Sequence, residues 1–121
     1  MKVVIDLIED IRESIQNSES YQITGMLLKE DEHDKKNLIY AGEAPVGSFH
    51  FDEISKELIF SIERDKKPLL ISDLVKHLLI LDMDMMMYEV KLSISENHEP
   101  KSLVGFGFNA TDKKYVLFIM E

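Results

Sequence analysis

Two closely spaced glycines near the C-terminal end form the most motif-like pattern in the chain. Residues 105–110, Gly-Phe-Gly-Phe-Asn-Ala, match the G-x-G-x-x-[G/A] spacing of dinucleotide-binding proteins. In those proteins the glycines let the backbone approach a pyrophosphate where a helix begins. Here residues 111–114 predict a turn and the residues from 115 onward predict a strand. We therefore interpret Gly105 and Gly107 as one face of a strand that leaves room for a helix or another backbone, and we predict no cofactor.

A dense cluster of carboxylates surrounds one imidazole in the first half of the chain. Its members are Glu30, Asp31, Glu32, His33 and Asp34. Oxygen-rich loops of this kind bind Ca²⁺ or Mg²⁺, but calcium loops space their ligands on alternate residues and turn at a glycine. This cluster has neither feature, so we predict no metal there. We interpret it as a solvated hairpin tip, with a recognition loop for a cationic partner as the alternative.

Asp82 and Asp84 form a D-x-D pair between a predicted helix and a predicted strand. Such a pair holds a divalent metal against phosphates when a phosphate-binding loop and a basic residue accompany it. The chain offers neither of these beside the pair. We favour a polar junction that ends the helix.

The four histidines, His33, His50, His77 and His98, are scattered along the chain. No two of them are four residues apart, and none belongs to an H-E-x-x-H pattern. Nucleophilic catalysis needs a nucleophile, a base and an orienting acid, and nothing in the sequence selects such a set. An enzyme is therefore the less favoured interpretation.

A methionine run extends over residues 83–87, with Met83, Met85, Met86 and Met87. Methionine is adaptable, so it fills irregular gaps in cores and is also overused at promiscuous binding surfaces. We favour a core position for this run. The alternative is a seam for a homodimer or a partner.

Composition excludes several classes of protein. The 121 residues are 45% hydrophobic and 31% charged, they include no cysteine, and the formal net charge is −9. This predicts one globular domain without disulfides, and we expect it to be soluble and cytoplasmic. The apolar stretch at residues 69–87 contains four charged residues and does not predict a membrane span. Nucleic acid and anionic membranes are not expected partners, because both repel an acidic protein.

The negative charge is concentrated in the first half of the chain. Residues 1–65 carry 15 Asp and Glu against 7 Lys and Arg, whereas residues 66–121 carry 8 against 7. Solubility requires net charge but not an uneven distribution of it. The asymmetry favours a basic partner.

Apolar spacing predicts a helix at the N-terminal end, followed by strands. The helix has Val4, Leu7, Ile8, Ile11 and Ile15 on one stripe. Strands are predicted over residues 21–29, 38–41, 49–51 and 58–62, with a turn or loop at 42–47 and a polar turn at 52–57.

A second helix is predicted after residue 71, with Ser72 as its N-cap and a more buried apolar face than that of the first. Its expected apolar positions are Leu74, Val75, Leu78, Leu79 and Leu81. Three strands follow, over residues 86–94, 103–108 and 115–120, and the last is apolar on both faces, as in a central strand. The predicted fold is an α+β domain of order α-β-β-β-β-α-β-β-β. Its mostly antiparallel sheet of about six or seven strands packs against two helices.

Two classes of function fit these features. The first is a protein-binding domain without chemistry of its own, most concretely an inhibitor or immunity protein that occludes a basic, nuclease-like partner such as a toxin. A chaperone for a secreted effector is a variant of it. The expected contact surface is acidic and comprises Asp6, Glu9, Asp10, Glu13, Glu30, Asp31, Glu32, Asp34, Asp52, Glu53 and Glu57.

The second class is a small enzyme or ligand-binding domain with a pocket between sheet and helices. Its polar groups would be His50, His77 or the Asp82 and Asp84 pair. A cavity that contains a group with a strongly shifted pKa would favour this class.

Overall fold

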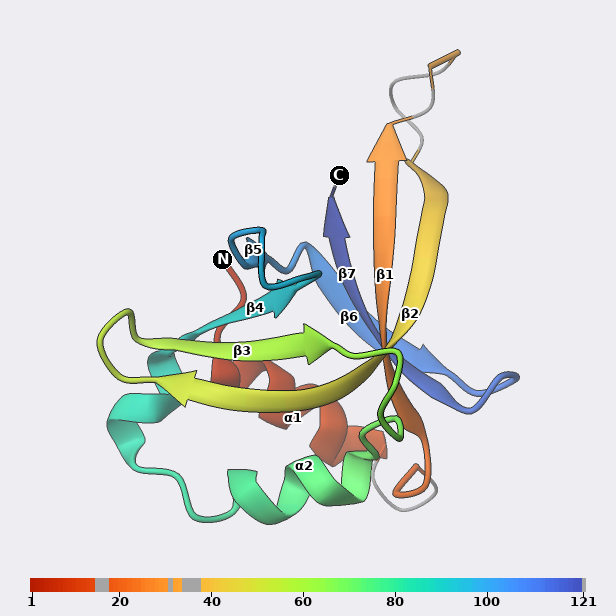
Figure 1. Ribbon diagram of the computed structural model, residues 1–121. Coiled ribbons are helices and arrows are strands. Elements are labelled where there is room, and N and C mark those ends of the chain that lie inside the picture. The colour runs from red at the N-terminus through yellow and green to blue at the C-terminus, as the bar shows by residue number, and fades with distance from the viewer. Residues whose placement is uncertain (15–17, 31, 34–37, 121) are drawn as a thin grey trace.

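The computed structural model describes residues 1–14, 18–30, 32–33 and 38–120. Its helical elements are α1 (Val4–Ser14), α2 (Ile71–Leu78) and the short 3₁₀ helix η2 (Met83–Met87). Its strands are β1 (Gln22–Glu30), β2 (Leu38–Asp52), β3 (Glu57–Ile62), β4 (Glu89–Ser93), β5 (Lys101–Ser102), β6 (Gly105–Asn109) and β7 (Lys114–Met120). The α+β class and the two α-helices agree with the sequence analysis (Figure 1).

The seven strands form one curved, mixed sheet in the order β5-β4-β3-β2-β1-β7-β6. Four of its neighbouring pairs are antiparallel, whereas β1 with β7 and β3 with β4 are parallel. The mixed sheet corrects the expectation of a mostly antiparallel one. Parallel neighbours need a long crossover, and the segment with α2 and η2 supplies it between β3 and β4.

A single 15-residue strand, β2, replaces the predicted pair of strands and the turn between them. Its first part pairs with β1 as far as Pro45, and its second part pairs with β3 from Val46 onward. The register shifts between Val46 and Ser48, where Gly47 lies. Pro45 and Gly47 therefore lie where the strand changes partner. At this place the sheet tolerates the absence of a backbone N–H at Pro45 and the bulge at Gly47. The observed order is α-β-β-β-α-β-β-β-β.

The strand predicted from residue 86 begins later, at Glu89, because residues 83–87 form η2 instead. A 3₁₀ helix has three residues per turn, and Met85 N–H donates to the Asp82 carbonyl at 3.1 Å in this geometry. The alternation of Met86 with Tyr88 therefore did not mark a strand. β5 was not predicted as a separate strand, since it has only two residues.

The predicted cap of α2 was wrong by two positions. Leu70 is the N-cap, and the Asp73 carboxylate accepts its backbone N–H at 3.1 Å. Ser72 lies within the first turn. The two helices contribute equal numbers of buried apolar side chains, three each, so the expected greater burial of α2 is not seen in this count. These are Val4, Leu7 and Ile11 from α1 and Ile71, Leu74 and Leu78 from α2.

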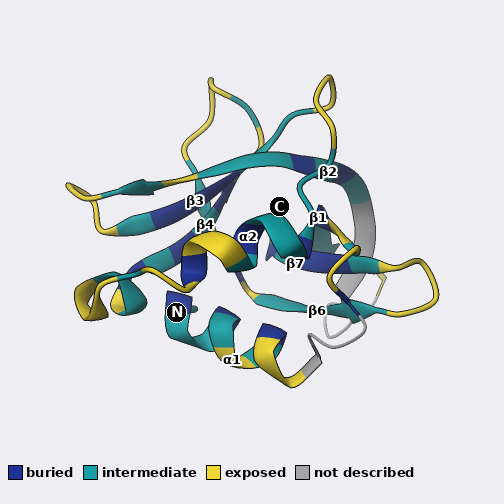
Figure 2. Cartoon of the chain, turned by 90° about the horizontal axis from the view of Figure 1, so that it is seen from below, coloured by how far each residue is buried: buried dark blue, intermediate teal, exposed yellow. Residues whose placement is uncertain are grey.

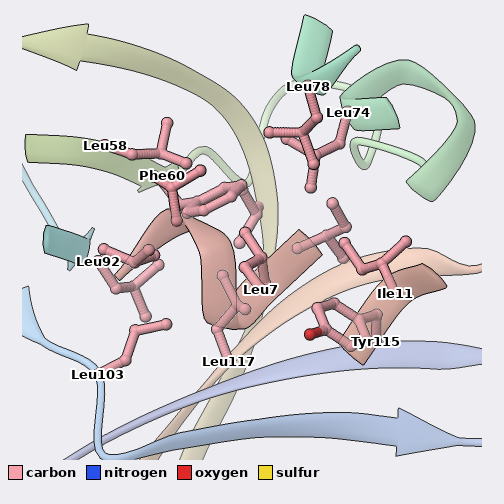
Figure 3. Packing of buried hydrophobic residues seen from close by; sticks show 14 of the residues in the cluster. Leu7, Ile11, Leu58, Phe60, Leu74, Leu78, Leu92, Leu103, Tyr115 and Leu117 are labelled. Atoms are coloured by element: carbon pink, nitrogen blue, oxygen red, sulfur yellow. The ribbon is translucent and has the colours of Figure 1, made fainter. Parts of the chain in front are cut away.

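The core lies between these helices and the inner face of the curved sheet. Figure 3 shows Leu7 and Ile11 of α1 beside Leu117 and Tyr115 of β7, with Phe60 of β3 close by. The sheet curves enough that a Cβ added at Gly25 of β1 would stand 2.7 Å from Ile62 of β3 and Leu92 of β4. β7 lies between β1 and the edge strand β6, so it is an interior strand, although not the central one expected from its apolar faces.

Both helices cover one face of the sheet, so that the molecule has a helical side (Figure 2). Among the described residues, no helix has the length and apolar character needed to cross a membrane. We use the name helical layer for residues 4–14 and 71–87, which contain α1, α2 and η2.

Candidate interaction surface

A shallow apolar groove separates α1 from α2. Its volume is about 310 Å³, and it is lined by Ile8, Ile11, Arg12, Val75, Leu78 and Leu79. Residues three and four apart lie on the same side of a helix, so each helix presents a short row beside its core stripe. The groove is apolar because both helices carry apolar side chains, such as Ile8 and Val75, next to the residues that are buried in the core.

The groove continues into four large apolar side chains that are exposed to solvent. Their exposed fractions are 80% for Leu79, 79% for Ile80, 85% for Met83 and 65% for Met87. We call these four residues the exposed apolar segment. The favoured prediction of a core position is therefore wrong for Met83 and Met87, whereas Met85 and Met86 are half-buried and Met85 packs against the core. The alternative, a surface seam, agrees with the exposure.

η2 lies against the N-terminal end of α1, although the two are far apart in sequence. The Val4 N–H donates to the Tyr88 carbonyl at 3.0 Å, and the two elements are in contact. Asp82 and Asp84 are exposed in this region. They form a polar junction as predicted, but it begins η2 at Asp82 rather than ending α2, which stops at Leu78.

The acidic residues selected from the sequence lie on three parts of the chain. Asp6, Glu9, Asp10 and Glu13 lie on α1, Glu30 and Glu32 at the end of β1, and Asp52, Glu53 and Glu57 at the turn between β2 and β3. The last two groups stand at opposite ends of β2, which at about 3.3 Å per residue are about 45 Å apart along the strand. Asp31 and Asp34 lie outside the described residues. Glu30 and Glu32 therefore do not share one continuous face with the residues of that turn.

Several of these carboxylates already have structural partners. The Asp6 carboxylate accepts the Val3 N–H at 3.0 Å, and Asp10 accepts the Tyr115 hydroxyl at 2.9 Å. By contrast, Glu9 and Glu13 on the same helix are exposed. The polar stripe of α1 thus divides into a structural pair and a solvent-facing pair.

The turn between β2 and β3 engages its carboxylates in the same way. Backbone N–H groups of Ser55 and Ile54 donate to Asp52 at 3.1 and 3.0 Å and lower its pKa. Lys91 forms an ion pair with Glu57, whose side chain is 14% exposed, and lowers the Glu57 pKa. Hydrogen bonds and opposite charge both favour the ionised carboxylate.

The residues considered for catalysis lie at exposed and separate positions. His50 and His77 are exposed. The His77 ring donates its Nδ1–H to the Asp73 carbonyl oxygen at 3.0 Å and packs edge-on against Phe49, with the ring centroids 5.1 Å apart. His98 contacts the Ser95 hydroxyl at 2.6 Å, and His33 is exposed. Within the described ranges, no group of three His, Asp or Glu residues could hold a metal ion.

The glycine pattern at residues 105–110 lies on β6 and the turn after it, followed by β7, as predicted. The expected close neighbour is missing, however. A Cβ added at Gly107 would meet nothing within 4 Å, and at Gly105 the nearest atom would be 3.9 Å away on Phe118. The explanation that these glycines make room for a packed element was therefore wrong.

A second apolar pocket, of about 260 Å³, is lined by residues of strands β1, β2, β3, β4 and β7. The pocket is lined by the apolar side chains of Leu27, Ile62, Leu92 and Ile94 and by the charged side chain of Arg64. Sequence reasoning missed both this pocket and the groove. The only available signal for the groove was the surplus of apolar residues at 79–83 beyond the core stripe of α2. The sheet pocket has no local signal, because its walls come from distant strands.

Comparison of the chain with models of protein families, with characterised proteins and with solved structures gave no match.

Proposed function

We propose that this chain is a non-enzymatic, protein-binding domain whose partner is basic. One observation carries the proposal. The helical layer has seven carboxylates against two cations, Arg12 and Lys76, and it exposes four large apolar side chains in the same region. Apolar contact supplies affinity at an interface, and surrounding charge supplies steering and selectivity.

In its most concrete form the proposal is an inhibitor or immunity protein that acts in the cytoplasm. Its partner would be a nuclease-like protein with a cationic cleft, which an acidic surface finds rapidly and then occludes. The contact surface differs from the one expected at first. It uses Glu9 and Glu13 of α1, and it adds Asp82 and Asp84, which belong to the nearly neutral half of the sequence.

A chaperone for a secreted effector is the second candidate. The exposed apolar segment favours it, because methionine-rich surfaces adapt to partners that lack a fixed structure. An inhibitor suppresses the activity of its folded partner, whereas a chaperone keeps its partner soluble without suppressing an activity. This difference separates the two candidates once a partner is in hand.

The experiment is affinity capture from the native cell followed by mass spectrometry at rising salt. We expect one dominant basic protein whose retention falls steeply between low and high salt, because the contact depends on screened charges. The double variant Glu9→Gln with Asp84→Asn should retain less of it. Glu96→Gln, an exposed carboxylate outside the helical layer, serves as the control. Failure to capture a partner, or retention that ignores both salt and the double variant, would contradict the proposal.

A further inference from the structure

The groove and the exposed apolar segment form one continuous surface, because Leu79 belongs to both. The α1 residues that line the groove, from Ile8 to Arg12, span about 6 Å, a little over one helical turn, and the exposed apolar segment extends the apolar surface from Leu79 toward η2. Apolar grooves between two helices receive the apolar stripe of a third helix in many complexes. This geometry suits side chains at helical spacing better than a flat protein surface.

The charges around this surface are acidic beside η2. Residues 78–90 contain Asp82, Asp84 and Glu89 and no Lys, Arg or His, and Asp82 and Asp84 are exposed. Arg12 also lines the groove, but the exposed carboxylates Glu9 and Glu13 lie close to it on α1, so its charge does not make that end of the groove basic. The acidic groups next to the exposed apolar segment are therefore Asp82 and Asp84.

We infer that this surface is the docking site for an amphipathic helix of the partner, with its cationic residues toward Asp82 and Asp84. The inference rests on the proposed function and adds the secondary structure, the polarity and the position of the bound segment. The apolar stripe of the helix enters the groove and covers Leu79, Ile80 and Met83.

A second copy of the chain is a poorer occupant of the same surface. A twofold dimer places identical patches against each other, so each helical layer would meet seven carboxylates with seven of its own. The two cations of each layer do not offset this repulsion. A basic helix bound to the same surface would face these carboxylates with positive charge, so the repulsion would not arise.

The test uses synthetic helical peptides of about 16 residues built from leucine and lysine. One carries a leucine stripe with lysines at one end, and the other has the same composition in a permuted order without a stripe. Binding is measured by fluorescence anisotropy, and NMR shift changes map the contact. We expect the permuted peptide to bind at least tenfold more weakly, with shifts at Ile8, Val75 and Leu79 for the striped peptide.

Matched variants test the surface itself. Leu79→Ser with Met83→Ser removes two exposed apolar side chains and should weaken the striped peptide about tenfold. Ile94→Ser removes an exposed side chain that lines the sheet pocket, outside the helical layer, and should change nothing. Circular dichroism on each variant confirms that its fold is retained. Polarity is read from NMR with a spin label at the lysine end, which should broaden Asp82 and Asp84 rather than Arg12.

The outcomes separate this inference from the proposed function. Equal binding of the striped and permuted peptides, or no effect of Leu79→Ser with Met83→Ser, would overturn the docking site. If the natural partner were still captured in a salt-dependent way, the proposed function would stand without it. Sedimentation that shows a dimer lost in Leu79→Ser would make a second copy the occupant and would also overturn the inference.

Discussion

At the scale of single residues, the buried hydroxyl of Tyr115 makes the clearest polar link between α1 and the sheet. It donates to the Asp10 carboxylate at 2.9 Å, and the ring packs against Phe106 and Phe108 with centroids 6.2 and 4.5 Å away. The sequence analysis placed Asp10 among the partner-binding carboxylates and Tyr115 only in an apolar strand. The contact joins residues 105 positions apart, so no local pattern could have revealed it.

Tyr115→Phe should destabilise the fold by about 2 kcal/mol, because it removes a hydrogen bond to a charged group. The packing of the ring is retained. The free energy of unfolding is measured by urea denaturation. Tyr21→Phe is the control, since none of the described hydrogen bonds involves its hydroxyl, and its effect should stay within about 0.5 kcal/mol. Equal effects of the two variants would contradict the structural role of the Asp10 contact.

The same residue predicts a loss of stability in alkali. Burial, together with the charge and hydrogen bond of Asp10, raises the pKa of Tyr115 above its ordinary value. Above pH of about 10 the unfolded chain releases this proton while the folded chain keeps it, so the free energy of unfolding falls as pH rises. The slope is at most about 1.4 kcal/mol per pH unit for one proton. Denaturation between pH 8 and 11 should show a shallower decline for Tyr115→Phe than for the wild type, and parallel declines would refute the assignment.

At the scale of elements, the strands were easier to recognise than their boundaries. The alternation of Leu58, Phe60 and Ile62 identified β3 because each faces the core at every second residue. β2 was divided wrongly because Pro45 and Gly47 usually mark turns. In the folded chain both residues lie where β2 leaves β1 and joins β3, and this exchange of partners is a property of the sheet, not of the segment.

The curvature of the sheet makes two glycines respond in opposite ways to the same change. Gly25→Ala places a Cβ 2.7 Å from Ile62 and from the buried Leu92, and should cost about 1–3 kcal/mol. Gly107→Ala meets nothing within 4 Å and no glycine among the described residues has a positive φ, so it should be neutral or slightly stabilising. Thermal unfolding of the two variants provides the comparison. A Gly25→Ala variant as stable as Gly107→Ala would show that β1 does not pack closely against β3 and β4.

At the scale of the whole molecule, β2 belongs to both halves of the sheet and ties them together. One half contains β3, β4 and β5, and the other contains β1, β7 and β6. α1 contributes Leu7 and Ile11 to the core that both halves share. Neither half has a core of its own, so we expect them to unfold as one unit.

This expectation gives a test of the single domain predicted from chain length. Unfolding followed by far-UV circular dichroism and by the near-UV signal of the tyrosines should give coincident transitions, as two-state domains do. Hydrogen exchange should be slowest for the interior strands β1 and β7 and faster for the edge strand β6. Separate transitions for the two signals would mean that the halves are independent.

The chain's own pattern was enough to define the α+β class, α1 with its core stripe, the core positions Leu74 and Leu78 of α2 and the interior position of β7, whereas Leu79, expected on the apolar face of α2, is exposed. These features follow from apolar spacing, which is local and is read from neighbouring residues. The fold alone assigned the parallel pairs, the passage of β2 between two partners, the exposure of Met83 and Met87 and the placement of Asp82 and Asp84 beside α1. Each depends on contacts between segments that are distant in sequence, and the stability of such contacts is a property of the packed molecule rather than of any segment.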